Sequence, residues 1–475
     1  MTSTHPPGGA PTADQAQRQL ALVFLPALAV FAACLADPTI FVDGDTNWHV
    51  AVGRWILAHR AVPHVDLFSY TFAGKPWVAD EWGSEALFGA AYLALGWSGV
   101  ALVTAVAMAV TIATIAVETA PRLPLLAATA SVALPFATIW PMLLARPHIL
   151  ALPALALWVA GLLRARRAGR TPALWLLAVM LVWANLHGSY LFGVVLVGVF
   201  GLEAALDAPG RRLATLLRWA VFGVAAWAVA GLTPNGLDGL ISPFRKLGMG
   251  SLGVIGEWKP ADFSKPSLFE ACLMLTVFVL VWRGVRLNAV RTGLLLLMLA
   301  MALQHVRYES LLAVTAAMLL ASPLGRALTP DAPETAPPLW RAAARDVTAP
   351  LAVIALLFLG LAVWRAAWPV VRTENRATPI AALAHVPPVL AAQPVFNSYD
   401  FGGWLVFNGV RDFIDGRNDM YGDAFMRNYL AVERDADPPA VTATFTRWKI
   451  AWVILPPGAR LGQLLDRTPG WRRLY

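Results

Sequence analysis

The sequence is poor in charge and in cysteine. Only 14% of its 475 residues are Asp, Glu, Lys or Arg, whereas soluble domains usually carry about 25%. So few charges cannot cover a water-facing surface, which excludes a soluble enzyme and a disordered protein. The two cysteines, Cys34 and Cys272, each lie in an apolar stretch. We therefore expect small buried thiols and no disulfide framework or zinc site.

Long apolar runs dominate instead, and the 20 Trp, 36 Gly and 35 Pro are typical of a polytopic membrane protein. A bilayer crossing needs about 20 mostly apolar residues. The spans are expected near 20–36, 98–117, 123–141, 147–163, 172–187, 188–206, 214–232, 267–282, 292–304, 309–323 and 350–368. The stretch 84–117 allows one long tilted helix, or an in-plane helix followed by a span that breaks near Gly96.

Arginine clusters in short segments between these runs, at 164–167, 211–212 and 283–291. The positive-inside rule assigns such segments to the cytoplasm, so the net charge of +8 reports orientation and not nucleic-acid binding. We expect a multi-pass protein of the cell inner (plasma) membrane with a cytoplasmic N-terminus. Its predicted parts are a disordered tail at 1–19, a transmembrane domain at 20–369 and a periplasmic or extracellular α/β domain at 370–475.

Short apolar runs near 394–396, 412–414 and 452–455 are the predicted strands of that C-terminal domain, and 422–434 and 438–447 are its predicted helices. The Pro- and Ala-rich segment 324–346 is predicted to be a cytoplasmic loop.

The predicted outer loop 37–83 is the densest polar region of the sequence. It contains Asp43, Asp45, His49, Asp80 and Glu81. Residues 46–57 predict an amphipathic helix on the membrane with Asp45 as its capping residue. A carboxylate in that position can act as a general base for a hydroxyl acceptor. The alternative is a polar loop with aromatic membrane anchors.

The run 43–82, DGDTNWHVAVGRWILAHRAVPHVDLFSYTFAGKPWVADEW, resembles the first outer loop of the C-type (GT-C) membrane glycosyltransferases. It is most similar to catalytic subunits of oligosaccharyltransferases. By this resemblance Asp45 corresponds to the catalytic carboxylate, with Asp43 as second choice. Asp80 and Glu81 stand where protein O-mannosyltransferases carry an Asp-Glu motif. The eleven apolar runs and the C-terminal pattern predict an all-α polytopic fold of about 11 transmembrane helices with a small α/β domain outside the membrane, and the resemblance implies that this fold is GT-C-like.

The run 397–422, NSYDFGGWLVFNGVRDFIDGRNDMYG, resembles the Trp-Trp-Asp-Tyr-Gly region of oligosaccharyltransferases, with Ser398-Tyr399-Asp400 in place of Trp-Trp-Asp. Asp400 and Arg417 are candidate partners, for a structural salt bridge or for acceptor binding. The family's second acidic motif has no counterpart in the turn that ends at His148. A divalent metal, magnesium or manganese held by Asp45 and His148, and a metal-independent mechanism both remain open.

Several basic residues at predicted span ends are candidates for binding a lipid phosphate. They are Arg146, His187, Arg245, Lys246, His305 and Arg307. The alternative for each is a snorkelling side chain at the membrane interface. Glu257 is a further candidate carboxylate in the loop 233–266, which either closes over the substrates, as a related loop does in the family, or is an ordinary interfacial loop.

These observations predict a glycosyltransferase that moves a sugar from a polyprenyl-phosphate-linked donor to a glycan, lipid or protein acceptor on the outer face. Asp45 would deprotonate or orient the acceptor, and Arg307, Arg146 and His187 would stabilise the leaving phosphate. Besides these substrates, membrane lipid is the expected partner, and nucleic acid is not. The alternatives are a transporter or flippase of lipid-linked saccharide and a non-catalytic GT-C-fold subunit of a glycan assembly complex.

Overall fold

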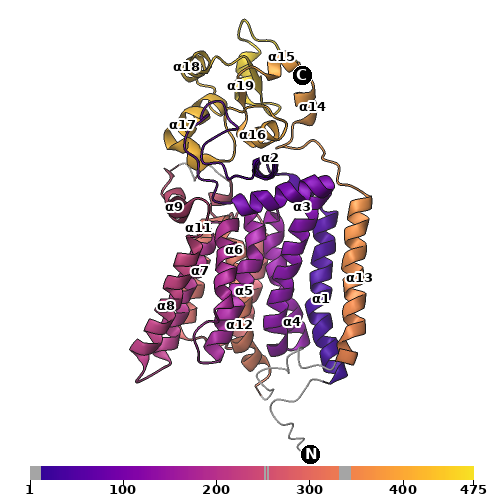
Figure 1. Ribbon diagram of the computed structural model, residues 1–475, viewed down its shortest axis with the longest axis vertical. Coiled ribbons are helices and arrows are strands. Elements are labelled where there is room, and N and C mark those ends of the chain that lie inside the picture. Colours follow the sequence, from indigo (N-terminus) through magenta and orange to yellow (C-terminus); the bar gives the residue numbers. More distant parts are fainter. Residues whose placement is uncertain (1–11, 251–252, 254–255, 331–343) are drawn as a thin grey trace, which may run out of the picture.

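The computed structural model describes residues 12–250, 253, 256–330 and 344–475. A bundle of apolar helices carries a small C-terminal domain over one end, the end opposite the start of α1 (Figure 1). We call this the domain end. The bundle helices are α1 (Ala13–Ala36), α3 (Trp82–Thr119), α4 (Leu125–Ile139), α5 (Pro147–Arg167), α6 (Trp175–Leu186), α7 (Tyr190–Leu206), α8 (Arg212–Ala230), α10 (Leu268–Trp282), α11 (Ala289–Gln304), α12 (Glu309–Leu328) and α13 (Ala344–Ala367).

Each predicted span coincides with one of these helices, so the prediction of a polytopic helical membrane protein is confirmed. Among the described residues, seven helices are long and apolar enough to cross a membrane: α1, α3, α4, α5, α8, α12 and α13. Four further apolar helices, α6, α7, α10 and α11, are shorter. Short 3₁₀ turns are η1 (Pro38–Phe41), η2 (Ala120–Arg122), η3 (Trp140–Met142), η5 (Gly256–Trp258) and η6 (Val306–Tyr308).

Helix α3 decides between the two interpretations of the stretch 84–117. Its helical geometry breaks at Leu95 and Gly96, and Gly96 has φ +58° and ψ −145°. Only glycine adopts such a conformation readily. The part before the break lies across the domain end of the bundle, and the part after it descends into the bundle (Figure 1). The chain therefore makes an in-plane helix followed by a single crossing.

Helix α2 (Asp45–His59) is the predicted helix of the first loop, and it packs between α3 and α16 (Tyr399–Phe407). Glycines allow this close packing, since a Cβ at Gly53 would lie 1.8 Å from the Glu85 carbonyl oxygen. The prediction that Asp45 caps the helix is wrong. Gly44 is the capping residue, and Asp43 Oδ1 accepts a hydrogen bond of 2.9 Å from the Asp45 amide. The Asp45 carboxylate is thereby left for tertiary contacts.

The C-terminal domain contains two described parallel strands, β1 (Val395–Asn397) and β2 (Trp452–Ile454), with Val395 opposite Trp452. Its helices are α14 (Ile380–Ala384), α15 (Pro388–Ala391), α16, α17 (Asn418–Glu433), α18 (Pro438–Trp448) and α19 (Arg460–Leu465). The small α/β domain is thus confirmed. The predicted strand at 412–414 is wrong, because Asp412 makes only an isolated bridge with Ser69.

Two boundary predictions also change. Helix α1 begins at Ala13 with a capping box formed by Thr12 and Gln15, so a disordered tail is wrong for residues 13–19, and residues 1–11 lie outside the described part. In the predicted loop 324–346, helix α12 continues to Leu328, while 331–343 also lie outside the described residues.

Candidate functional site

A cavity of about 490 Å³ lies where the bundle meets the C-terminal domain. Its polar wall comes from α2, the segment 77–85, the start of α5, the turn after α6, α9 (Gly236–Leu247), η5, η6 and the loop 416–419. Its other wall is apolar and continues along α5, α7 and α11. The apolar residues there include Leu152, Leu155, Phe192, Val195, Leu294 and Leu297. The cavity is therefore amphipathic, with charge at the domain end and hydrocarbon deeper in the bundle.

Arg146 gathers three carboxylates at the polar wall. It stands directly before α5, where Pro147 begins the helix. Its guanidinium lies 2.7 Å from Asp45 Oδ2, 3.2 Å from Glu257 Oε2 and 3.6 Å from Asp43 Oδ2. Burial by itself lowers the pKa of Arg146, but Glu257, Asp45 and Asp43 outweigh it and hold the pKa well above its usual range. We call these four residues the Arg146 cluster.

Glu257 also holds the second cation of the site. Arg307 Nη1 lies 3.2 Å from Glu257 Oε1, and its guanidinium stacks 4.2 Å above the Trp258 ring centroid. Burial tends to raise the pKa of Glu257, but Arg146 and Arg307 outweigh it and lower the pKa to about 2. Glu257 is therefore ionised at neutral pH and positions two arginines, which makes it a poor general base.

Asp45 has a different electrostatic environment within the same cluster. Its Oδ1 accepts a 3.0 Å hydrogen bond from Trp48 Nε1. The loop of the C-terminal domain covers it, since a Cβ at Gly416 would lie 1.8 Å from the same oxygen. Burial raises the pKa of Asp45 to about 7, although Arg146 opposes the shift. A carboxylate that titrates near neutral pH suits general-base chemistry.

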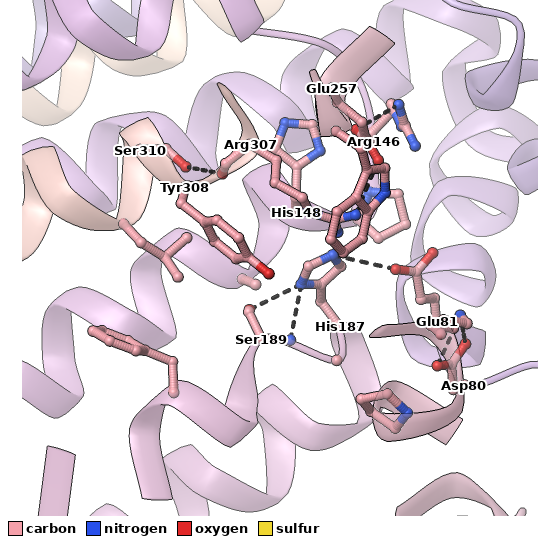
Figure 2. Close-up of a pocket in the computed structure, with 18 of the residues that line it drawn as sticks. Asp80, Glu81, Arg146, His148, His187, Ser189, Glu257, Arg307, Tyr308 and Ser310 are labelled. Atoms are coloured by element: carbon pink, nitrogen blue, oxygen red, sulfur yellow. Dashed lines mark hydrogen bonds and ion pairs between the residues drawn. The ribbon is translucent and has the colours of Figure 1, made fainter. Parts of the chain in front are cut away.

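A second acid lies between two histidines on the same wall. Glu81 Oε1 is 3.4 Å from His187 Nε2 (Figure 2). Glu81 Oε2 is 3.8 Å from His49 Nε2. The fully buried Glu85 approaches the other nitrogen of His49 at 3.5 Å. Burial raises the pKa of Glu81 to about 8, with Lys246 opposing it. These separations exceed normal hydrogen bonds, so Glu81 is free to bond a substrate group.

The tautomer of His187 follows from its neighbours. The amide of Ser189 donates to His187 Nδ1 at 3.1 Å (Figure 2), so that nitrogen carries no proton. Burial, followed by the charge of Arg307, lowers the pKa of His187 well below its usual value. The neutral ring therefore presents a donor at Nε2.

Lys246 connects α9 to the first loop. Its Nζ lies 2.8 and 2.9 Å from the two Asp80 carboxylate oxygens and 3.8 Å from Asp419. Ser242 donates to Asp80 at 3.0 Å. Asp80 is thus engaged in holding the loop 233–266 against the cavity, rather than pointing free into it.

Four predicted site residues lie outside the cavity lining, and Asp43 of the Arg146 cluster is one of them. Arg245 is exposed and pairs with Asp238 at 3.3 Å. His305 Nδ1 is 2.6 Å from the Trp258 carbonyl oxygen. Asp400 is exposed, and its predicted pairing with Arg417 is wrong. Arg417 instead binds Asp66 and Asp415, each at 2.6 Å, because the first loop folds against the C-terminal domain.

The predicted metal ligands do not come together. Asp45 faces Arg146, and His148 Nε2 lies 3.3 Å from the Met142 carbonyl oxygen. Across the described ranges, no three His, Cys, Asp or Glu side chains are placed to hold a metal ion. A guanidinium occupies the point where the carboxylates converge, so these residues do not fit a divalent ion.

Glu85 and Asp419 also line the cavity but were not predicted from the sequence. Glu85 follows Glu81 by one helical turn on an otherwise apolar helix, and that spacing was a usable signal. No local pattern marks Asp419, because it reaches the cavity only through the packing of α17 beside α9.

The bundle, the in-plane helix and the domain over one end define a GT-C-like fold. No protein-family model matches the sequence, and no curated protein matches it. Among solved structures, the chain is similar to the archaeal oligosaccharyltransferase AglB from Archaeoglobus fulgidus in complex with an inhibitory peptide and a dolichol-phosphate. The TM-score is 0.59 at 12% identity, over 92% of this chain and 69% of that one.

It is also similar to the Archaeoglobus fulgidus oligosaccharyltransferase in the apo form, with a TM-score of 0.54 at 12% identity, over 90% of this chain and 69% of that chain. At this identity the likeness establishes the fold alone. The predicted resemblance of the chain to the GT-C superfamily is confirmed at the level of the fold.

Proposed function

We propose that the protein is a membrane glycosyltransferase that transfers a sugar from a polyprenyl-phosphate-linked donor to an acceptor outside the cytoplasm. One observation carries this proposal: a single cavity combines two arginines and titratable carboxylates with an apolar wall that runs into the bundle. A lipid phosphate has the same division into an anionic head and a hydrocarbon tail. The dolichol-phosphate and peptide named for the AglB structure are consistent with such substrates.

The apolar wall also gives a path for the lipid. Val195 of α7 and Leu297 of α11 both line the cavity, yet their exposed fractions are 51% and 53%. Side chains that face a cavity and the outer surface of a bundle mark a lateral opening. A polyprenyl chain entering between α7 and α11 would bring its phosphate towards Arg307.

Each polar group then has a role in transfer. The acceptor atom forms a bond to the anomeric carbon, the bond between that carbon and the phosphate oxygen breaks, and its electron pair goes to the phosphate. The acceptor's proton passes to Asp45. Arg307 and Arg146 stabilise the negative charge that grows on the leaving phosphate, and His187 donates from Nε2. A raised pKa makes Asp45 a better match for this proton transfer than the strongly acidic Glu257.

The observations favour transfer over the alternatives. A flippase needs ionisable groups along the middle of its spans, whereas the charged side chains of the described spans lie towards the helix ends. A subunit without activity would have no need to keep Asp45 and Glu81 at a shared cavity. We also propose that the arginine-rich helix ends are cytoplasmic and that residues 370–475 lie outside the cytoplasm.

Purified protein in lipid, incubated with a panel of polyprenyl-linked sugars, tests the proposal through release of the free carrier phosphate. We expect release by wild type, none by Asp45→Asn, and wild-type release by Asp238→Asn. The last change is the matched control, because Asp238 is an exposed carboxylate paired with Arg245 away from the cavity. Equal release by all three, or donor translocation without release, contradicts the proposal.

A further inference from the structure

The Arg146 cluster has the arrangement expected around a bound cation. We infer that the guanidinium of Arg146 stands in for a divalent metal at this site. It holds the carboxylates in place permanently, and its removal would open a site for a divalent cation. This inference rests on the proposed function only for what it says about catalysis, because its binding test needs no sugar donor.

Three carboxylates from distant parts of the chain converge on the guanidinium of Arg146. Asp43 and Asp45 come from the first loop and Glu257 from η5, segments more than 200 positions apart in the chain. Their oxygens reach one guanidinium at 2.7, 3.2 and 3.6 Å. The side chains of these acids are only 14–23% exposed. Carboxylates so enclosed repel one another unless a cation lies between them.

The positive charge of Arg146 is permanent and its position is fixed. A guanidinium cannot lose its proton in this setting, and its planar fork bonds several carboxylate oxygens at once. Its backbone position is also restricted, because a residue before proline is held in an extended conformation. Arg146 has φ −131° and ψ 159°, directly before Pro147. The cation is therefore part of the chain and is delivered to one fixed point.

Removing Arg146 would leave three carboxylates as possible metal ligands. Oxygen donors from carboxylates are the ligands that magnesium and manganese prefer. As the described residues stand, no three His, Cys, Asp or Glu side chains are grouped closely enough to hold an ion, so the acids would have to draw together once Arg146 is removed. Without Arg146, the acids Asp43, Asp45 and Glu257 would remain near one another with no cation between them and would attract a divalent ion.

Arg307 is the matched comparison within the same cavity. It also pairs with Glu257, at 3.2 Å, but it makes no ion pair with Asp43 or Asp45 among the described contacts. Removing Arg307 leaves Arg146 between all three acids, so it should not create a metal site.

The experiment measures Mn²⁺ binding by electron paramagnetic resonance on the full chain in lipid nanodiscs, with no sugar donor present. We expect Arg146→Ala and Arg146→Gln to bind one Mn²⁺ about tenfold or more tighter than wild type. Arg146→Lys and Arg307→Ala should bind it as weakly as wild type does. Adding Asp45→Asn to Arg146→Ala should remove the gain. Thermal unfolding with and without Mn²⁺ gives an independent measure of the same binding.

Two results would overturn the inference: wild type binding Mn²⁺ as tightly as Arg146→Ala, or no gain in either Arg146 variant. If both variants fold only in Mn²⁺, that rescue supports the inference. If neither Arg146 variant folds under any condition, the wild-type protein is the test. Mn²⁺ binding by wild type that is lost in Asp45→Asn would overturn the inference, and the absence of such binding would support it.

Carrier release by wild type in EDTA should equal release in Mg²⁺. If wild type releases no carrier from any donor, the proposed function fails while the Mn²⁺ result still stands.

Discussion

Arg146 and Arg417 each bind carboxylates from distant parts of the chain, but at different depths. The Arg417 side chain is 1% exposed, and its partners Asp66 and Asp415 are fully buried. Rings of Phe68 and Trp77 lie 5.3 and 4.9 Å from its guanidinium. The Arg146 side chain is 18% exposed and lines the cavity. Arg417 also borders the cavity, but its guanidinium is enclosed by its partners and joins segments, whereas that of Arg146 is open enough to meet a ligand as well.

The difference shows how the same chemistry serves folding in one place and function in another. Arg417 joins the first loop to the C-terminal domain and thereby positions Gly416 over Asp45. Arg146 receives the carboxylates that this packing delivers. The ion pairs of Arg417 therefore hold the C-terminal domain against the first loop. The Arg146 cluster lies at the cavity, where a substrate would bind.

Arg417→Ala should give the largest loss of stability. It leaves Asp66 and Asp415 buried without a cation, and breaking a buried pair on one side costs about 3–5 kcal/mol. Thermal unfolding of the detergent-purified protein measures the change. Arg245→Ala, which removes an exposed arginine, is the control and should unfold like wild type. If Arg417→Ala is as stable as this control, Arg417 does not have the structural role that distinguishes it from Arg146.

Asp45→Asn should abolish carrier release while unfolding close to the wild-type temperature. Removing a general base costs about 10²–10⁴-fold in rate, and loss of its charge in a partly exposed cluster should affect packing little. Release assays and thermal unfolding on the same preparation separate the two effects. An active variant would transfer the proposed role to Asp43 or Glu81.

Arg307→Ala should weaken donor binding and slow transfer by about 10²-fold, because charge on the leaving phosphate grows in the transition state. Arg307→Lys should recover part of the binding and less of the rate, since it loses the bidentate fork. Donor titration and single-turnover release measure the two quantities. If both variants match wild type, Arg307 is an interfacial anchor and the phosphate site lies nearer Arg146.

The pH dependence should show the smallest effect and identify the base. A carboxylate accepts a proton only when ionised, and burial raises the pKa of Asp45 to about 7 and that of Glu81 to about 8. Transfer should therefore rise with pH and level off above about 7 if Asp45 is the base. A midpoint near 8 that disappears in Glu81→Gln would assign the role to Glu81. Below the midpoint the rate should fall about tenfold per pH unit.

The apolar helices of the bundle could be predicted from the sequence because a helix that crosses a bilayer needs a long apolar run. The predicted runs at 98–117 and 147–163 therefore coincide with α3 and α5, while the structure decided in favour of a break at Gly96, one of the two alternatives that the sequence left open. Predictions were wrong where a polar side chain could bond to more than one partner or where burial depended on tertiary packing. Asp43, and not Asp45, bonds the first amide of α2, and the run 412–414 is buried without forming a strand.

The amino-acid order alone determined that the chain is a polytopic helical membrane protein and that a small α/β domain follows the last span. Apolar length, helical period and arginine spacing are local properties, so they need no folded context. Only the tertiary structure decided that Arg146 meets Asp45 and Glu257, and that Arg417 meets Asp66 and not Asp400. Those contacts join residues about 100 to 350 positions apart, and packing of whole elements brings such residues together, which no local pattern encodes.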